Sequence, residues 1–427
     1  MQNFFKELEW RGFLHSSTSG VEEHLAKGSV TGYVGFDPTA SSLHVGSLLP
    51  IMGLVHLQKA GHKPIAVAGG GTGMIGDPSG KTQERKLLTI GEIEANLEGI
   101  KKQLAYFLDF NRKPNPAKLV NNADWLTRIS MMEFLRDVGK HFSVNEMLAK
   151  DSVKSRIDQE QGMSFTEFSY SLLQAFDFLE LYNRHACTLQ MGGSYQWGNI
   201  VAGVDLIRRT RGAEAHGIVF PLITTSTGTK FGKTESGTIW LDPGRTSPYK
   251  FYQFWYNTDD RDVIQYLKFF TPLPLERILD LENAVKGSPE KREAQVTLAQ
   301  EVTRMLHGEA ALSQATKASK VFFGGEISPQ GGVGEHELLD IFSDVPSVGI
   351  PKDQVAGAGV ALIDLLVTAG VVKSKGEARR AIQGGGIYIN NQRAADVEKK
   401  ITASEVIHGK FIVLRKGGRN YWLVRVT

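Results

Sequence analysis

The chain has 427 residues, of which 41% are hydrophobic and 22% charged, and its formal net charge is +3. This length exceeds what a single core usually serves, so we expect two or three domains of ordinary globular composition. No apolar run approaches the roughly 18 residues that span a bilayer, and the N-terminus lacks a signal-peptide core. A single cysteine, Cys187, excludes a disulfide framework within the chain and fits a reducing cytoplasm. The 11 histidines form no metal-binding spacing, so no dedicated metal site is expected.

The charge is unevenly distributed along the chain. Residues 352–427 carry 13 Lys or Arg and 6 Asp or Glu, a net charge of +7, which leaves −4 for the remainder. A basic tail on a mildly acidic body favours contact with a polyanion, although a solvated basic surface would give the same count.

The first part of the chain alternates short apolar strands with amphipathic helices. Strands are expected at residues 30–36 and 63–68, with a helix at 43–60 between them. This is a βαβ unit, which implies a parallel sheet with a right-handed crossover. Further helices are expected at 90–109, 130–148 and 166–182, and strands at 188–191 and 217–224.

The second part of the chain is helical and then basic. Residues 248–321 show only helical periodicity, and glycines and prolines then mark a linker around a short helix at 335–343. In the tail, helices are expected at 360–372 and from Lys373, a hairpin at 387–393, and strands at 411–414 and 421–426. The predicted organisation is an α/β parallel-sheet domain (1–247), an all-α domain (248–323), a linker (324–359) and a small α+β domain (360–427).

Three glycine-rich segments resemble phosphate loops. Gly71-Thr-Gly-Met-Ile-Gly76 matches the dinucleotide fingerprint of dehydrogenases, but turn residues follow it where that fingerprint needs a helix N-terminus. The segments 76–82 and 228–234 each have three residues between their glycines, where a P-loop needs four. Both nucleotide-loop interpretations are therefore disfavoured, but lysines flanked by glycine remain suited to closing over a triphosphate.

Two segments together favour ATP chemistry. His44-Val-Gly-Ser47 lies between the first strand and its helix, where ligands bind in open parallel sheets and where helix N-termini attract phosphate. The second segment, Lys230-Phe-Gly-Lys-Thr234, supplies two ammonium groups. A lone histidine near a helix cap is usually an ordinary surface residue, and only the pairing of the two segments changes that interpretation.

These segments resemble the two signatures of class I aminoacyl-tRNA synthetases, and we call them the first and second signatures. Their context is more specific. The motifs Tyr33-Val-Gly-Phe-Asp-Pro-Thr-Ala40, Gly73-Met-Ile-Gly-Asp-Pro-Ser-Gly-Lys81, Phe165-Thr-Glu-Phe-Ser-Tyr170 and Gly192-Gly-Ser-Tyr-Gln-Trp-Gly-Asn199 are similar, in order, to those of bacterial tyrosyl-tRNA synthetases. The resemblance covers essentially the whole chain. It implies a Rossmann-like catalytic domain, an anticodon-side helical domain and a C-terminal S-four-type RNA-binding domain.

The resemblance also implies a site for tyrosine. The family's phenol contacts match Tyr33 and Asp177, and its amino-group contacts match Asp77, Tyr170 and Gln174, with Gln196 nearby. Residues 170, 174 and 177 would share one helix face. The helix is apolar almost all round and therefore buried, so Gln174 and Asp177 should need polar partners, which a bound tyrosine would supply. Such a site disfavours phenylalanine, because its own polar groups would be left unpaired.

For ATP, supplied with Mg²⁺ as the substrate complex, the resemblance implies two sets of residues. The set acting on the phosphates is Thr39, His44, Lys81, Arg85, Lys230, Lys233 and Thr234. The set for the rest of the nucleotide is Gly35, Asp37, His44, Gly46, Ser47, Gly192 and Lys233. Two positions depart from the family, because Ser47 stands where histidine is usual and Tyr195 where an aspartate grips the ribose. These departures put the ribose contact in question.

The expected partners are L-tyrosine, ATP and tRNA(Tyr), and family members are homodimers. A basic helix presenting Lys373, Lys375, Arg379 and Arg380 could follow an RNA backbone. Two alternatives stay open: a noncatalytic RNA-binding relative, supported only by Ser47 and Tyr195, and a synthetase for tryptophan, which Tyr33 and Asp177 disfavour.

Overall fold

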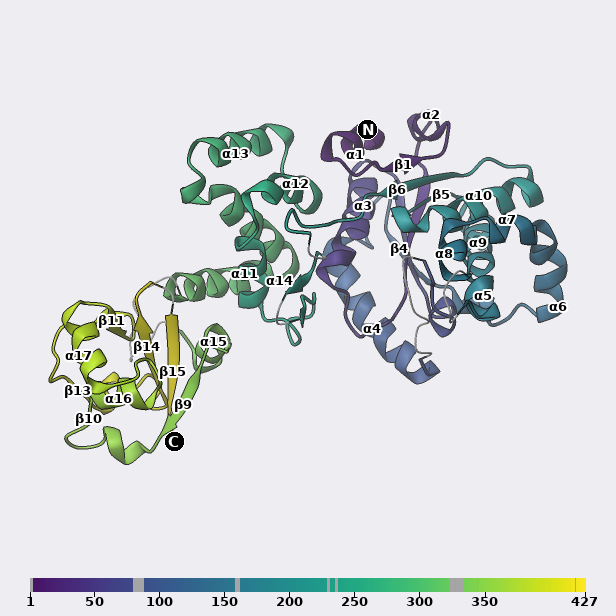
Figure 1. The fold of residues 1–427 in the computed structure, drawn as a ribbon. Coiled ribbons are helices and arrows are strands. Elements are labelled where there is room, and N and C mark those ends of the chain that lie inside the picture. Colours follow the sequence, from purple (N-terminus) through teal and green to yellow (C-terminus); the bar gives the residue numbers. More distant parts are fainter. Residues whose placement is uncertain are drawn as a thin grey trace. The chain divides into compact units, whose positions relative to one another are not determined.

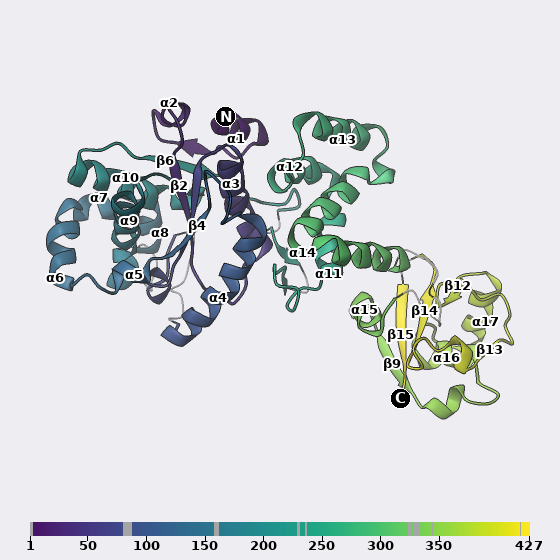
Figure 2. The same cartoon turned by 180° about the vertical axis from the view of Figure 1, so that it is seen from behind.

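A computed structural model describes residues 3–79, 88–157, 162–228, 231–234, 237–322, 327, 333–343, 345–418 and 420–427 of the chain. The chain forms two compact units (Figures 1 and 2). Unit 1 comprises Met1–Arg245 and Thr258–Leu306, and unit 2 comprises Thr246–Asn257 and His307–Thr427. Within the described ranges, every helix is too short or too polar to cross a membrane.

Unit 1 is built on a six-stranded sheet in the order β1-β6-β5-β2-β3-β4. Its strands are β1 (Ser16–Ser17), β2 (Thr31–Phe36), β3 (Lys63–Ala68), β4 (Lys118–Asn121), β5 (Cys187–Gly193) and β6 (His216–Phe220). All neighbours pair in parallel except β1, which runs antiparallel to β6. The predicted parallel α/β sheet is confirmed, but β4 was missed and the last strand ends at Phe220 rather than residue 224.

Long helices flank this sheet (Figure 1). They are α3 (Leu48–Lys59), α4 (Ile90–Phe107), α9 (Phe165–His185) and α10 (Trp197–Arg211). The α4 helix begins with a capping box, in which Thr89 and Glu92 each bond the other's backbone N–H. The helix predicted at 43–60 begins later, because residues 43–44 are extended and Val45–Ser47 form a 3-10 turn.

The helix predicted at 130–148 is wrong as a single element. It divides into α6 (Met131–Glu133), a π turn (Phe134–Val138), a 3-10 turn (Gly139–His141) and α7 (Val144–Leu148). Ser130 caps the first part, and Phe142 and Ser143 adopt extended backbone before the last. Two short helices, α5 (Ala123–Leu126) and α8 (Asp151–Ile157), precede and follow this stretch.

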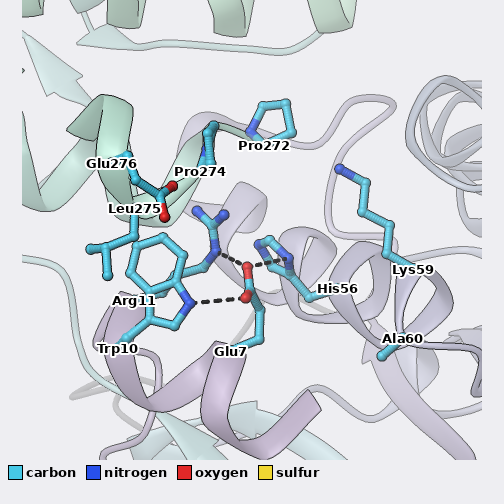
Figure 3. Close-up of a pocket in the computed structure, with 10 residues that line it drawn as sticks. All are labelled: Glu7, Trp10, Arg11, His56, Lys59, Ala60, Pro272, Pro274, Leu275 and Glu276. Carbon is cyan, nitrogen blue, oxygen red and sulfur yellow. Dashed lines mark hydrogen bonds and ion pairs between the residues drawn. The ribbon is translucent and has the colours of Figure 1, made fainter. Parts of the chain in front are cut away.

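The N-terminal helix α1 (Phe4–Arg11) joins residues far apart in the sequence; a short α2 (Val21–Ala26) follows it. The buried guanidinium of Arg11 donates hydrogen bonds of 2.8–3.0 Å to the carbonyls of Lys268, Thr271 and Leu273, and its Nε lies 2.6 Å from a Glu7 carboxylate oxygen. Arg11 and Glu7 line a cavity of about 380 Å³ (Figure 3). Its lining, as far as the structure describes the chain, contains no residue expected in the catalytic site.

Helices make up the chain from 248 to 322, as predicted. They are α11 (Pro248–Tyr256), α12 (Asp260–Phe270), α13 (Leu275–Gly287) and α14 (Glu293–Phe322). A non-helical residue, Gly308 with φ of +79°, interrupts α14 close to the boundary between the units. A left-handed φ of this kind is one that glycine adopts without strain.

Unit 2 contains a five-stranded sheet in the order β12-β11-β14-β15-β9. Its strands are β9 (Ser347–Ile350), β11 (Ile387–Ile389), β12 (Gln392–Arg393), β14 (Phe411–Lys416) and β15 (Asn420–Val426). The helices are α15 (Glu335–Ile341), α16 (Leu362–Thr368) and α17 (Lys375–Gln383), and β10 (Val360–Ala361) pairs with β13 (Lys400–Ile401). The predicted hairpin is confirmed. The linker expectation is wrong at residues 347–350, since β9 pairs in parallel with β15.

Candidate active site

The candidate site lies where the order of the main sheet reverses direction. From β2 the chain proceeds through β3 to β4 on one side, whereas β5 and β6 lie on the other. The carboxyl ends of β2 and β5 therefore border a topological switch point, where open α/β sheets bind ligands. Tyr33 of β2 pairs in register with Gln190 of β5, and Asp37 and Gly192 follow these positions at the same edge.

Asp177 is a buried carboxylate at this switch point. It lies on α9, 3% exposed, and accepts hydrogen bonds from Asn122 Nδ2 at 2.9 Å and from Trp125 Nε1 at 2.7 Å. Burial raises the pKa of Asp177 to about 7, although the two donors act in the opposite direction. The predicted need for polar partners is confirmed, but protein donors already supply them.

Tyr33 presents a buried hydroxyl near this carboxylate. Its ring contacts Phe178 at 5.3 Å between centroids, and its hydroxyl has no hydrogen-bond partner among the described residues. Burial, and next the charge of Asp177, raise the pKa of Tyr33 well above its usual value, so the phenol stays protonated. A buried hydroxyl left unpaired in this way is suited to a hydrogen bond with a ligand.

A second polar group surrounds Tyr170, which precedes Asp177 by two helical turns. The Tyr170 hydroxyl donates to Asp37 at 3.1 Å, and Thr72 donates to the other oxygen of that carboxylate at 2.9 Å. Thr72 in turn accepts from Asn122 at 2.9 Å. One chain of hydrogen bonds therefore runs from Asp37 to Asp177, and it fixes the position of both carboxylates.

A third group joins Asp77, Gln174 and Gln196. Gln196 donates to Asp77 at 2.5 Å and accepts from Gln174 at 3.0 Å, and Asn199 of α10 donates to Gln174 at 3.1 Å. Ser79 N–H donates to Asp77 at 2.9 Å. The structure thus brings together all six residues expected for tyrosine: Tyr33, Asp77, Tyr170, Gln174, Asp177 and Gln196. The acidic groups suit an ammonium group, and Tyr33 with Asp177 suits a phenol.

Asn122, Trp125, Thr72 and Asn199 join this network but were not predicted. Asn122 and Trp125 follow β4, a four-residue strand without clear alternation, so no sequence signal marked the sheet edge on which they lie. Asn199 is the exception, because it ends a motif that carried the resemblance. Asp37, expected near the nucleotide, accepts a hydrogen bond from Tyr170.

The first and second signatures lie side by side. His44 forms a β-bridge with Trp240, and hydrogen bonds join Val45 N–H to Ile239 O at 3.0 Å and Leu241 N–H to Leu43 O at 2.9 Å. A Cβ on Gly232 would lie only 2.7 Å from Val45 Cγ2, so the second signature packs directly on the first. This contact supports the pairing on which the ATP prediction depended.

Within the first signature, His44 is exposed and its Nδ1 accepts a hydrogen bond of 3.0 Å from Gly46 N–H. Ser47 precedes α3 without a side-chain capping bond. The exposed Thr39 and Gly35 lie at or beyond the end of β2, and a Cβ at Gly35 would meet nothing within 4 Å. This edge of the sheet is therefore open to a ligand.

The structure says little about the cationic residues expected to contact the phosphates. Lys81, Arg85 and Lys230 lie outside the described residues. For Lys233 and Thr234 only the backbone is described: it forms β7 (Lys233–Thr234), paired with β8 (Gly237–Thr238). Among the described ranges, no cluster of three histidine, cysteine or acidic residues could hold a metal ion.

The expected RNA-binding residues lie in unit 2 at and before α17. Lys373, Lys375, Arg379 and Arg380 are all exposed. Lys375 Nζ lies 2.6 Å from an Asp364 oxygen, so part of its charge is balanced within the unit. The other three have no ion pair among the described residues.

Comparisons with known proteins agree with this fold. A family model described as "tRNA synthetases class I (W and Y)" matches residues 25–324, and one described as "Tyrosine--tRNA ligase SYY-like C-terminal domain" matches residues 337–424. The chain belongs to the class I tRNA synthetases of the W and Y family.

Individual relatives narrow the similarity within that family. The chain is 57% identical to a tyrosine--tRNA ligase of Roseiflexus castenholzii over 427 residues, covering 100% of both chains. It is 53% identical to that of Geobacillus stearothermophilus over 422 residues, covering 98% of both. A solved structure of a C-terminally truncated mitochondrial tyrosyl-tRNA synthetase from Aspergillus nidulans matches with a TM-score of 0.69 and 31% identity, over 75% of this chain and 94% of that one.

Proposed function

We propose that this protein is a tyrosine–tRNA ligase. It joins L-tyrosine to ATP, which gives tyrosyl-adenylate and pyrophosphate, and then transfers tyrosine to the 3′ end of tRNA(Tyr) for translation in the cytoplasm. The observation that carries the proposal is the group of polar side chains at the switch point. There a buried carboxylate, Asp177, lies near the Tyr33 phenol, which has no hydrogen-bond partner among the described residues. Asp37 is linked to Asp177 by one chain of hydrogen bonds, and Asp77 belongs to a second hydrogen-bonded group with Gln196.

Activation needs no nucleophilic side chain, because the tyrosine carboxylate is already ionised. One of its oxygens attacks the α-phosphorus of ATP, a P–O bond forms, and the bond to the pyrophosphate oxygen breaks. Magnesium enters with ATP as part of the substrate. Catalysis then consists of positioning and of stabilising the charge that develops on the phosphates.

We assign the phosphate contacts to cationic and hydrogen-bonding residues of both signatures, to Thr39, and to two residues of the segment 81–85. These residues are Thr39, His44, Lys81, Arg85, Lys230, Lys233 and Thr234. The open edge formed by Gly35, Gly46, Ser47 and Gly192 would accommodate the nucleoside. The hydrogen bond from Tyr170 to Asp37 draws this carboxylate toward the amino-acid pocket, so Asp37 would face the junction between tyrosine and nucleotide.

We infer that residues 360–427 bind tRNA through the basic residues at α17, and that the helical segment 248–323 faces the anticodon side. The exposed side chains of Lys373, Arg379 and Arg380 support the first assignment, since phosphate contacts come from accessible cations.

We also propose a homodimer that buries an apolar face of unit 1. Large hydrophobic side chains are exposed along one stretch of the chain, including Met131 (74%), Met132 (75%), Val144 (60%) and Phe165 (77%). They belong to α6, α7 and the start of α9. Figures 1 and 2 show α6 and α7 together at one end of unit 1. Exposed apolar side chains grouped in this way are typical of a protein interface.

Tyrosine-dependent exchange of labelled pyrophosphate into ATP tests the proposal. Exchange with tyrosine is the expected result, because activation is reversible. Absence of exchange with any amino acid would favour a noncatalytic RNA-binding relative, and exchange with tryptophan would overturn the choice of substrate.

A further inference from the structure

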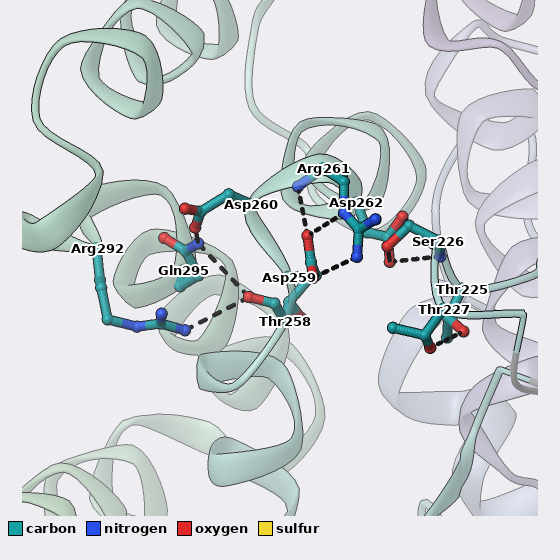
Figure 4. Close-up of polar contacts among 10 residues, drawn as sticks. All are labelled: Thr225, Ser226, Thr227, Thr258, Asp259, Asp260, Arg261, Asp262, Arg292 and Gln295. Carbon is teal, nitrogen blue, oxygen red and sulfur yellow. Dashed lines mark hydrogen bonds and ion pairs between the residues drawn. The ribbon is translucent and has the colours of Figure 1, made fainter.

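One face of α12 contacts the second signature and the chain that leads to it. Asp262, Tyr266 and Phe270 are spaced four residues apart, so they form one stripe along the helix, which we call the α12 stripe. Figure 4 shows its first member beside Ser226, which lies four residues before the second signature.

Asp262 holds Ser226 through three hydrogen bonds. The Ser226 N–H donates to the two carboxylate oxygens at 3.2 and 3.0 Å, and its hydroxyl donates to Oδ2 at 3.0 Å. The neighbouring acids have other partners, because Asp259 pairs with Arg261 and Asp260 accepts from Gln295. Asp262 is therefore the acid of this helix start that faces the loop (Figure 4).

The rest of the α12 stripe holds the second signature itself. The ring of Phe231 stacks on Phe270, with 5.5 Å between centroids and 7° between planes, and meets Tyr266 edge-on at 5.0 Å. Phe231 is buried, so this contact is an apolar anchor. The next residue, Gly232, packs on Val45 of the first signature.

We propose that the α12 stripe positions the lysines of the second signature for adenylate formation, with Asp262 as a positioning residue. The stripe fixes the chain on both sides of Lys230, through Ser226 before it and Phe231 after it. Lys233 follows two residues beyond Phe231, in the short strand β7. This inference rests on the proposed function, because it concerns the ATP step of that reaction.

The ammonium groups of the lysines can stabilise the phosphates only if they lie close to them when negative charge develops there. A lysine contributes fully only if its position is fixed before the reaction, and a displacement of about 1 Å can cost up to about 100-fold in rate. Loss of the Asp262 anchor would leave the residues expected for tyrosine in place, since no hydrogen bond or ion pair within the described ranges joins them to Asp262. The effect should therefore fall on ATP and leave tyrosine binding unchanged.

The test uses the full-length chain with Asp262→Ala, Ser226→Ala and Ser226→Thr. We expect Asp262→Ala to lower kcat/KM for ATP in pyrophosphate exchange roughly tenfold, and Ser226→Ala to lower it less. Ser226→Thr, which keeps the hydroxyl, should restore the parent value. Tyrosine affinity and the single-turnover transfer from preformed adenylate to tRNA should stay within twofold of the parent.

Asp259→Asn is the matched control, because it alters a carboxylate on the same helix start and still caps the helix. It should leave exchange unchanged. The inference is overturned if exchange by Asp262→Ala stays within twofold of the parent, or if tyrosine affinity falls in parallel with it. Should Asp262→Ala not fold, the Ser226 pair decides, and equal values for the alanine and threonine variants overturn the inference. Absence of exchange in the parent would instead refute the proposed function.

Discussion

Burial of the Asp177 carboxylate lowers the stability of the fold. The carboxylate is buried, and the hydrogen bonds from Asn122 and Trp125 offset only part of its desolvation, since the pKa still lies near 7. Retention of a buried charge at such a position is typical of residues selected for binding rather than for stability.

The raised pKa of Asp177 predicts how stability depends on pH. Between its usual pKa near 4 and about 7, the folded state holds a proton that the unfolded state has released, so stability falls as pH rises through this window. Asp177→Asn removes this dependence. The free energy of unfolding of the variant, relative to that of the parent, should therefore rise by roughly 3 kcal/mol from pH 5 to pH 8. Urea unfolding of both proteins at both pH values measures this change. Unfolding curves whose difference is the same at both pH values would contradict the prediction.

Tyr33 and Tyr170 predict opposite effects of removing a hydroxyl. Tyr33→Phe deletes a buried hydroxyl that has no partner in the described part of the chain, so the stability of the free protein should rise by about 1 kcal/mol. Tyr170→Phe breaks the bond to Asp37 and should lower stability by about 1 kcal/mol. Tyr33→Phe should also narrow the preference for tyrosine over phenylalanine in pyrophosphate exchange. Denaturant unfolding and exchange with both amino acids check the pair, and stability changes of equal sign would refute it.

At the scale of elements, the basic residues of α17 predict a defect confined to tRNA. Arg379→Ala with Arg380→Ala should raise KM for tRNA roughly tenfold and flatten its salt dependence, because two phosphate contacts are lost. Pyrophosphate exchange needs no tRNA and should not change. Lys352→Ala with Arg425→Ala removes two exposed charges elsewhere in unit 2 and serves as the control. Equal defects in both double variants would point to general attraction rather than to a site on α17.

Sequence periodicity predicted the helices that bury one face and the strands that are buried on both faces. The strands β2 and β3 and the helices α4 and α9 are regular enough to be read directly from the chain. β4 and β9 were missed because each has four residues and little alternation in burial. The break at 130–148 escaped because local extended backbone at Phe142 and Ser143 interrupts an otherwise helical pattern.

The site was predictable only in part. Tyr170, Gln174 and Asp177 could be grouped because helix geometry places them on one face, and the family resemblance gave their roles. The partners of Asp177 come from the chain after β4, and only the order of strands in the folded sheet brings them to α9. Likewise, no local pattern indicates that Asp262 reaches Ser226, because 36 residues separate them.

At the scale of the whole molecule, the exposed apolar side chains of unit 1 predict a change of assembly. Phe165→Asp should convert the proposed dimer to monomers, because a buried charge in an apolar interface is costly. Leu279→Asp, at a 46% exposed leucine of α13, makes the same chemical change elsewhere and should leave the mass unchanged. Sedimentation velocity distinguishes the two. A monomeric parent, or a dimeric Phe165→Asp, would rule out this interface.

The hydrogen bonds of Arg11 have a consequence for synthesis on the ribosome. Its acceptors, the carbonyls of Lys268, Thr271 and Leu273, lie some 260 residues further along the chain. At about 5–20 residues per second, the N-terminal helix emerges roughly 10 to 50 seconds before the peptide groups that it will bind. During that time the Arg11 guanidinium stays exposed, because the carbonyls that cover it have not yet been synthesised. A nascent chain stalled before residue 268 should therefore leave α1 open to proteolysis. A chain stalled after residue 273 has left the ribosomal tunnel should protect α1.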